Sequence, residues 1–332
     1  MRFARVTRPF RPSLVGTIGL ATALLASACG TSSSAGTNPT SSGLEKTHIK
    51  VGVVPIVDAA PFFLAIKEGY FRQEGLDVSY QVVAKSTDAI PDILHGTVDM
   101  VAAANYTSFF AADAHNTFKL SVIAPSSTCG TNTQNILVMP GSKIKTAAGL
   151  TGKTIAVNIN PNIQTITANA VLQAQGVNTA LVKYTAINFA LMGAALKAGR
   201  VDAISEVEPY LTNTERTLGA VSVLAQCQGP TIGIPLAGIV TTQQWAQKYP
   251  NTARAFQRAL LKGNALADTD RQAVEKILPT YIPTISPETA ALIALNGYPT
   301  AQDATQLQRV ADLMLSGKML QTHLNVTPLL FH

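Results

Sequence analysis

Two pairs of polar residues stand at the ends of apolar segments, where their side chains could bind a small molecule. Glu206 and Glu208 end one segment, and Asn105 and Tyr106 end another. A carboxylate in such a place accepts hydrogen bonds from an amine or a protonated ring nitrogen and repels a simple anion. No arginine or lysine occupies these segment ends, which disfavours a carboxylate ligand held by a bidentate arginine. A nitrogenous molecule and an anion held at helix N-termini both remain open.

The same local pattern precedes both pairs. Residues 96–99 read Gly-Thr-Val-Asp and residues 199–202 read Gly-Arg-Val-Asp, each before an apolar run. A helix that ends at a left-handed glycine and leads into a buried parallel strand gives this pattern. One such unit in each half predicts two α/β lobes. Ligands of open α/β sheets bind beyond the carboxyl ends of the strands, so both pairs are expected to face a shared crevice.

Motifs of catalysis and of metal binding are missing from the sequence. It contains no Gly-x-Ser-x-Gly elbow, phosphate-binding loop or His-Glu-x-x-His, and its five histidines are scattered without ligand spacing. We therefore expect no catalytic residue, no metal and no cofactor.

The first 47 residues are typical of an exported protein. Four arginines precede a mainly apolar run over residues 14–26, which is too short to span a bilayer comfortably and ends in Ser27-Ala28-Cys29. This end resembles a bacterial lipobox, which implies a signal peptide over residues 1–28 and a lipid on Cys29. A plain secreted protein is the alternative. Residues 29–47 are rich in Ser, Thr and Gly and predict a flexible tether.

The composition supports a large folded body after the tether. Of the 332 residues 47% are hydrophobic and 13% are charged, and the formal net charge of +6 includes the four leader arginines. The small positive excess that remains gives no indication of a nucleic-acid partner.

Several ordered blocks resemble periplasmic solute-binding proteins of the sulfonate, taurine, nitrate and pyrimidine-precursor type, which also include the NMT1/THI5-like domains. Both Gly-x-Val-Asp units are similar to blocks of this family. Three further blocks resemble it: Lys-Glu-Gly-Tyr-Phe at 67–71 with Glu-Gly-Leu-Asp-Val at 74–78, Leu-Thr-Gly-Lys-Thr-Ile-Ala-Val at 150–157, and Glu-Pro at 208–209. The resemblance covers residues 49 to about 225 in order.

The resemblance implies the α/β, two-lobed fold of type II periplasmic binding proteins. That fold has two parallel or mixed sheets, helices on both faces of each sheet and a ligand cleft between the lobes. We expect lobe 1 to comprise residues 48–133 and 230–332, and lobe 2 residues 134–229. The implied function is that of a monomeric, exported lipoprotein on the outer face of the cell membrane or in the periplasm, which passes a solute to the permease and ATPase subunits of an ATP-driven importer.

The resemblance and the strand-end rule together predict the residues around the cleft. They are Asp58, Asn105, Tyr106, Ser126, Thr128, Asn160, Gln164, Glu206 and Glu208. The expected ligand is an aminopyrimidine or an alkanesulfonate such as taurine. The carboxylate of Glu206 favours the nitrogenous ligand, provided that it faces the cleft.

Two other functions remain open on the same fold. One is an enzyme, because the THI5-like branch includes a pyrimidine-precursor synthase and other relatives act in quinone-precursor synthesis. That synthase resemblance requires a cysteine-rich run, whereas residues 126–130 read Ser-Ser-Thr-Cys-Gly. The other is a tethered protein that binds only proteins, which has no need of the ordered blocks.

The three cysteines predict one disulfide. If Cys29 carries lipid and the compartment is oxidising, Cys129 and Cys227 remain, and both fall where the chain is expected to cross between lobes. Two separate buried thiols are the alternative.

Overall fold

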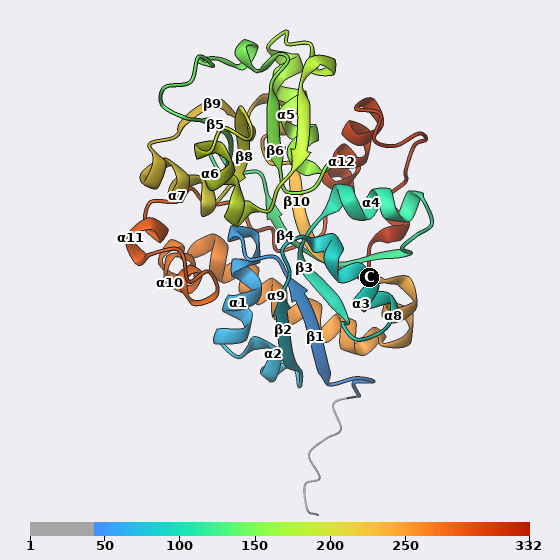
Figure 1. Ribbon diagram of the computed structural model, residues 1–332. Coiled ribbons are helices and arrows are strands. Elements are labelled where there is room, and N and C mark those ends of the chain that lie inside the picture. Colours follow the sequence, from blue (N-terminus) through green and yellow to red (C-terminus); the bar gives the residue numbers. More distant parts are fainter. Residues whose placement is uncertain (1–42) are drawn as a thin grey trace, which may run out of the picture. The chain divides into compact units, whose positions relative to one another are not determined.

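The computed structural model describes residues 43–332 and builds them around two five-stranded sheets (Figure 1). The first sheet has the order β2-β1-β3-β10-β4, with the strands β1 (His48–Val53), β2 (Asp77–Val82), β3 (Met100–Asn105), β4 (Leu120–Thr128) and β10 (Pro235–Thr242). The second has the order β7-β6-β8-β5-β9, with β5 (Gln134–Val138), β6 (Thr154–Val157), β7 (Lys183–Ala186), β8 (Ala203–Val207) and β9 (Val221–Ala225). We call each sheet with its helices lobe 1 and lobe 2.

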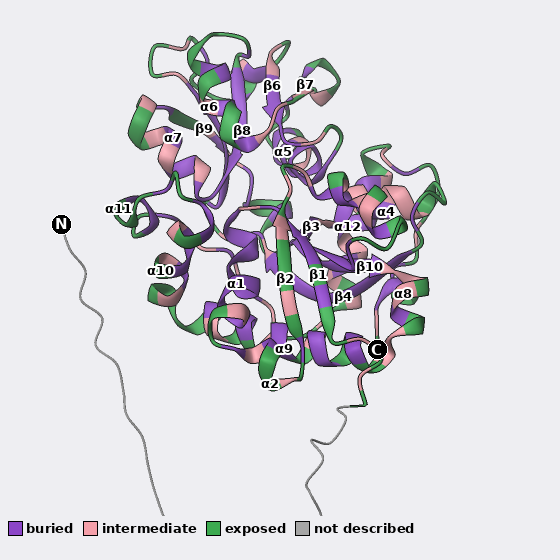
Figure 2. Cartoon of the chain, turned by 60° about the horizontal axis from the view of Figure 1, so that its bottom comes forward, coloured by how far each residue is buried: buried purple, intermediate pink, exposed green. Residues whose placement is uncertain are grey.

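Both sheets are mixed. In the first sheet β1 pairs in parallel with β2 and β3, and β10 lies antiparallel between β3 and β4. In the second sheet β6 pairs in parallel with β7 and β8, and β5 runs antiparallel to β8 and β9. The strands β3, β5 and β8 are buried along nearly their whole length because helices cover both of their faces (Figure 2).

The helices divide between the two faces of each sheet. One face of the first sheet packs α1 (Ala60–Lys67), α2 (Tyr70–Gln73), α9 (Pro250–Thr269) and α10 (Arg271–Tyr281), and the other packs α3 (Ile90–Leu94), α4 (Tyr106–Ala114) and α12 (Ala304–Ser316). In lobe 2, α5 (Ile163–Ala174) covers one face, and α6 (Phe189–Lys197) and α7 (Tyr210–Leu218) cover the other. The two short helices α8 (Gln243–Lys248) and α11 (Pro287–Ala290) complete the set.

The long helix α9 lies unusually close to α1. A β-carbon at Gly263 would stand 2.2 Å from the carbonyl oxygen of Pro61 and 3.1 Å from the β-carbon of Ala65. Only glycine leaves room for this close contact between the helices. Phe256 and Leu260 are also buried residues of α9. The residue at position 263 therefore sets the distance between the two helices.

We expect Gly263→Ala to lower the free energy of unfolding by about 1–3 kcal/mol, because the added methyl group overfills this contact. Urea denaturation measures the change. Gly141→Ala is the matched control, since a β-carbon there meets nothing within 4 Å. Equal denaturation midpoints for the two variants would contradict the close approach of α9 and α1.

The chain enters lobe 1 through Glu45 and Lys46, which belong to the predicted tether. The carboxylate of Glu45 accepts hydrogen bonds from the backbone N–H groups of Asn251 and Thr252 at 3.1 and 3.0 Å, at the N-terminus of α9. The backbone N–H of Lys46 donates to Thr252 Oγ1 at 3.0 Å. The packed body thus begins before Thr47, because Glu45 supplies the carboxylate that a helix N-terminus favours. The predicted signal peptide, the lipid on Cys29 and residues 29–42 of the tether lie outside the described residues.

Two segments carry the chain between the sheets. One joins β4 to β5 and contains Cys129, and the other joins β9 to β10 and contains Cys227. These two cysteines form a disulfide with 5.3 Å between their α-carbons, and both are buried. The lobe limits at 133/134 and 229/230 stay a prediction, which limited proteolysis tests. No helix within residues 43–332 is long and apolar enough to cross a membrane.

Candidate functional site

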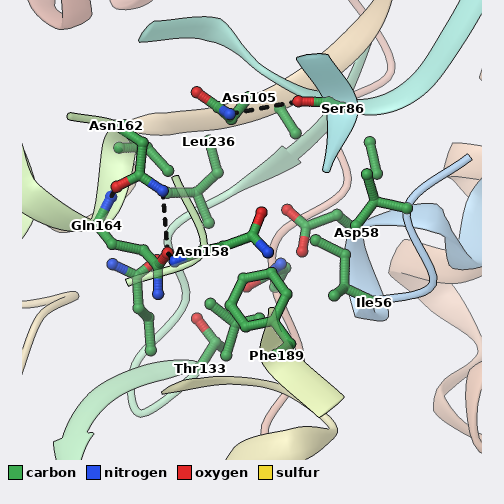
Figure 3. A pocket seen from close by; sticks show the side chains of 17 residues that line it. Ile56, Asp58, Ser86, Asn105, Thr133, Asn158, Asn162, Gln164, Phe189 and Leu236 are labelled. Carbon is green, nitrogen blue, oxygen red and sulfur yellow. Dashed lines mark hydrogen bonds between the residues drawn. The ribbon is translucent and has the colours of Figure 1, made fainter. Parts of the chain in front are cut away.

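A cavity of about 40 Å³ lies between the two sheets (Figure 3). Its lining includes six side-chain amides, those of Asn105, Gln134, Asn158, Asn162, Gln164 and Asn296. Apolar side chains complete much of the wall, including Val54, Ile56, Ile163, Phe189, Val207 and Leu236. Among residues 43–332, Asp58 is the only charged residue that lines the cavity, and no lysine, arginine or histidine does so. Such a cavity binds by hydrogen bonds and apolar contact rather than by a basic side chain.

Three helices begin at this cavity. Asn105 is the N-cap of α4, and its side chain accepts from the N–H of Ser108 at 3.0 Å. Asn162 is the N-cap of α5, and Phe189 is the first residue of α6. The positive ends of three helix dipoles therefore meet at one place, which favours an anionic group or a hydrogen-bond acceptor.

Gln164 braces the wall of lobe 2. Its Oε1 accepts from the N–H of Asn158 at 2.7 Å and from Nδ2 of Asn162 at 2.9 Å. Its Nε2 donates to the carbonyl of Ser205 at 2.5 Å and to the hydroxyl of Ser205 at 3.0 Å. These bonds use both hydrogens and both lone pairs of the amide. Gln164 thus fixes the loop 158–162 against β8 and has no hydrogen-bonding capacity left for a ligand.

Asp58 and Asn296 form the opposite wall. Asp58 lies in the 3₁₀ turn Val57–Ala59 after β1, and the hydroxyl of Ser127 donates to its Oδ1. Burial raises the pKa of Asp58, and hydrogen bonds from Ser127 and Asn296 oppose that rise. The Oδ1 atom of Asn296 is buried and has no hydrogen-bond partner in the part of the chain that the structure describes. This wall thus presents acceptor oxygens to the cavity.

Of the nine residues predicted for the cleft, three line this cavity: Asp58, Asn105 and Gln164. Tyr106 turns into the core of lobe 1, where its hydroxyl crowds Gly238. Ser126 and Thr128 stay within β4, where Thr128 pairs with Gly297. Asn160 lies on the surface, and its Nδ2 donates to the carbonyl of Tyr184 at 3.0 Å.

Glu206 and Glu208 also lie away from the cavity lining. Glu206 is fully buried, and neither of its carboxylate oxygens has a hydrogen-bond partner within residues 43–332. Burial first, and then the charge of Glu208, raises the pKa of Glu206 well above its ordinary value. Because Glu206 does not face the cavity, its carboxylate no longer favours a nitrogenous ligand.

Glu208 connects the two lobes and does not line the cavity. Its Oε1 accepts from the hydroxyl of Thr212 at 2.8 Å and from the N–H of Ala294 at 3.1 Å. Its backbone carbonyl accepts from the N–H of Val57 in lobe 1 at 3.0 Å. Burial raises the pKa of Glu208 to about 7, against hydrogen bonds that lower it.

The sequence analysis missed several lining residues, notably Asn158, Asn162, Gln134 and Asn296. Asn158 and Asn162 belong to the Asn-rich stretch 158–162 that contains the predicted Asn160, and their spacing before a helix is a usable signal. Gln134 begins β5, so its position follows once that strand is assigned. Asn296 has no comparable signal because it lies in the loop after α11. Within residues 43–332 no group of three or more His, Cys, Asp or Glu side chains could hold a metal ion.

Known proteins share this architecture. The chain is similar to the alkanesulfonate-binding protein SsuA from Xanthomonas axonopodis pv. citri bound to MOPS, with a TM-score of 0.69 and 19% identity over 86% of this chain and 98% of that one. It is also similar to the periplasmic nitrate-binding protein NrtA from Synechocystis, with a TM-score of 0.66 and 16% identity over 78% of this chain and 73% of that one.

One curated relative is much longer than this chain. The nitrate import ATP-binding protein NrtC of Synechocystis sp. is 24% identical over 266 residues, which are 73% of this chain and 39% of the relative. The chain thus spans about two fifths of that relative's length. Residues 57–272, more than half of the chain, match the family described as NMT1/THI5 like. The protein therefore has the type II periplasmic-binding-protein fold and belongs to the NMT1/THI5-like family.

Proposed function

We propose that this protein is the substrate-binding component of an ATP-driven importer and captures a small nitrogen- or sulfur-containing organic solute between its lobes. The observation that carries the proposal is the amide-lined cavity at the meeting point of three helix N-termini. The names of the similar proteins, which bind alkanesulfonate or nitrate or take part in nitrate import, support the same class. The partners are then the permease and ATPase subunits in the membrane.

The lining selects the chemistry of the solute. A bare anion gains only helix dipoles and amide N–H groups here, and it faces the carboxyl group of Asp58. An aminosulfonate such as taurine offers an anionic end for the helices and a nitrogen for the opposite wall. An aminopyrimidine offers ring acceptors and an amino group, and Phe189 supplies an aromatic face beside them.

The lobes must part for such a solute to enter. The cavity of about 40 Å³ holds roughly three water molecules. One contact between the lobes at the cavity is the hydrogen bond from Asn158 Nδ2 in lobe 2 to the carbonyl of Ala84 in lobe 1 at 3.2 Å. Closure of two lobes about their connecting segments is a common way to enclose a ligand.

Titration calorimetry against taurine, ethanesulfonate, nitrate and an aminopyrimidine tests the proposed function. We expect at least one organic probe to bind, and Asn158→Ala to weaken it by about tenfold, or 1.4 kcal/mol, because the amide lines the cavity and bridges the lobes. Asn160→Ala, two residues away on the surface, is the matched control. Equal affinities of the two variants would contradict this site, and no binding of any probe would contradict the function.

Export and anchoring belong to the same proposal. A substrate-binding component works outside the cytoplasmic membrane, and the buried disulfide Cys129–Cys227 suits an oxidising compartment. We infer that a lipid on Cys29 holds the protein at the membrane. Mass spectrometry of the mature N-terminal peptide distinguishes an acylated Cys29 from a freely secreted chain.

A further inference from the structure

The wall of the cavity formed by Asp58 and Asn296 differs from the rest of the lining in its hydrogen-bonding character. Asp58 is 4% exposed and Asn296 is 6% exposed, and both line the cavity. The Oδ1 atom of Asn296 has no partner among the described residues, although buried amide oxygens in folded proteins are nearly always bonded.

The neighbours of Asp58 leave part of its carboxyl group available. The Ser127 hydroxyl donates to Oδ1, and the Asn296 amide lies close enough to lower the pKa of the carboxyl group. No ion pair involves Asp58 among the described residues. The carboxyl group and the free amide oxygen therefore form a pair of acceptors with no basic side chain beside them.

Three asparagines of the lining have the opposite hydrogen-bonding character. The side-chain amides of Asn105, Asn158 and Asn162 each donate one hydrogen bond within the described residues, to Ser86, Ala84 and Gln164. Each NH₂ group has two hydrogens, so each keeps one for a further acceptor. In Figure 3 Asn162 lies across the cavity from Asp58, Asn105 lies beside Ser86, and the side chain of Asn158 extends toward Asp58. The lining of the cavity therefore combines amide hydrogens that are free to donate with the acceptor oxygens of Asp58 and Asn296.

We propose that Asp58 and Asn296 together bind an amino group of the solute. This inference rests on the proposed function and narrows the solute to molecules with an NH₂ or NH₃⁺ group whose acceptor atoms lie at the far end. The amino group supplies one hydrogen to the carboxylate and one to Asn296 Oδ1. The anionic or ring-acceptor end then faces the N–H groups of Asn105, Asn158 and Asn162 and the helix N-termini.

Matched probes that differ only in the amino group test the inference. Taurine and isethionate share a sulfonate and differ in an amino or a hydroxyl group, and an aminopyrimidine is compared with the same pyrimidine lacking its amino group. We expect the amino-bearing member of at least one pair to bind at least about tenfold more tightly by calorimetry. Asp58→Asn should abolish that difference, and Asp77→Asn on the exposed face of β2 should leave it unchanged.

A second variant keeps the inference testable if Asp58→Asn does not fold. Asn296→Ala removes the unpartnered oxygen and should weaken the amino-bearing probe more than its partner, with circular dichroism confirming that each variant is folded. Equal binding of both members of every pair, or equal weakening of both by each variant, would overturn the inference and leave the proposed function standing. Failure of every probe to bind would contradict the proposed function and the inference with it.

Discussion

Replacing Cys129 and Cys227 with alanine is expected to lower the free energy of unfolding by about 3–5 kcal/mol. The disulfide joins residues 98 positions apart, and loops of that length restrict the unfolded chain strongly. Urea denaturation of the double variant measures the loss. Unfolding of the native protein under a reducing agent should give the same loss, because it breaks the same cross-link without changing a side chain.

We expect the double variant to lose stability but to keep both sheets. The register of each sheet depends on its own strands, so the double variant should keep its circular dichroism spectrum in the absence of urea. Single Cys→Ala variants should lose as much stability as the double variant. A double variant as stable as the unreduced parent would show that the two thiols are separate in the folded protein.

The free energy of unfolding is expected to fall by about 3 kcal/mol or more as the pH rises from 4.5 to 8. Folding raises the pKa of Glu208 from 4.5 to about 7 and raises that of Glu206 well above 4.5. Above pH 4.5 the unfolded chain therefore releases protons that the folded protein keeps, so stability falls with rising pH. The loss from Glu208 is complete above about pH 7, and Glu206 extends it further.

Glu206→Gln separates the two contributions. Glutamine has nearly the same shape, and among the described residues Glu206 has no hydrogen-bond partner to lose. The variant should be more stable than the parent at pH 8 and show a shallower decline with pH, while the part that belongs to Glu208 remains. Urea denaturation at several pH values gives both curves. Parallel curves for the parent and the variant would mean that Glu206 does not carry a raised pKa.

The sequence predicted the two sheets because the signal was local and repeated. Each Gly-x-Val-Asp unit marks the end of a helix and the start of a buried strand, which became β3 and β8. Asn105, a polar residue at a strand end that also caps the next helix, lies in the cavity lining. The predicted tether, by contrast, extends too far, to residue 47. Composition does not reveal that the carboxylate of Glu45 accepts hydrogen bonds at the N-terminus of α9.

The side chains at the ends of strands were harder to predict. Val207 and Gln134 are opposite each other in the β5–β8 ladder and line the cavity, whereas Glu206 and Asn135 form the next pair and point to the other face. A shift of one residue therefore decides between ligand contact and complete burial. Tyr106 illustrates the same limit on a helix, since it follows the lining residue Asn105 and turns into the core.

The segment around Asn296 depends on packing that no local pattern encodes. Gly130 has no room for a β-carbon, which would stand 2.4 Å from the carbonyl oxygen of Leu295. Gly297 forms an isolated bridge with Thr128 and would place a β-carbon 2.6 Å from its hydroxyl. Two glycines far apart in the chain thus bring Asn296 to the cavity, and only the folded structure relates them.

The same short segment gives ligand binding a thermodynamic link to the position of the lobes. Ala294 donates to Glu208 of lobe 2, Gly297 pairs with Thr128 of lobe 1, and Asn296 between them lines the cavity. We call the arrangement in which the N–H of Ala294 is hydrogen-bonded to Glu208 the closed arrangement. A solute that binds Asn296 more tightly in this arrangement must, by reciprocity, stabilise the arrangement by the same free energy. A membrane partner that recognises only the closed arrangement would then distinguish loaded from empty protein without contacting the solute.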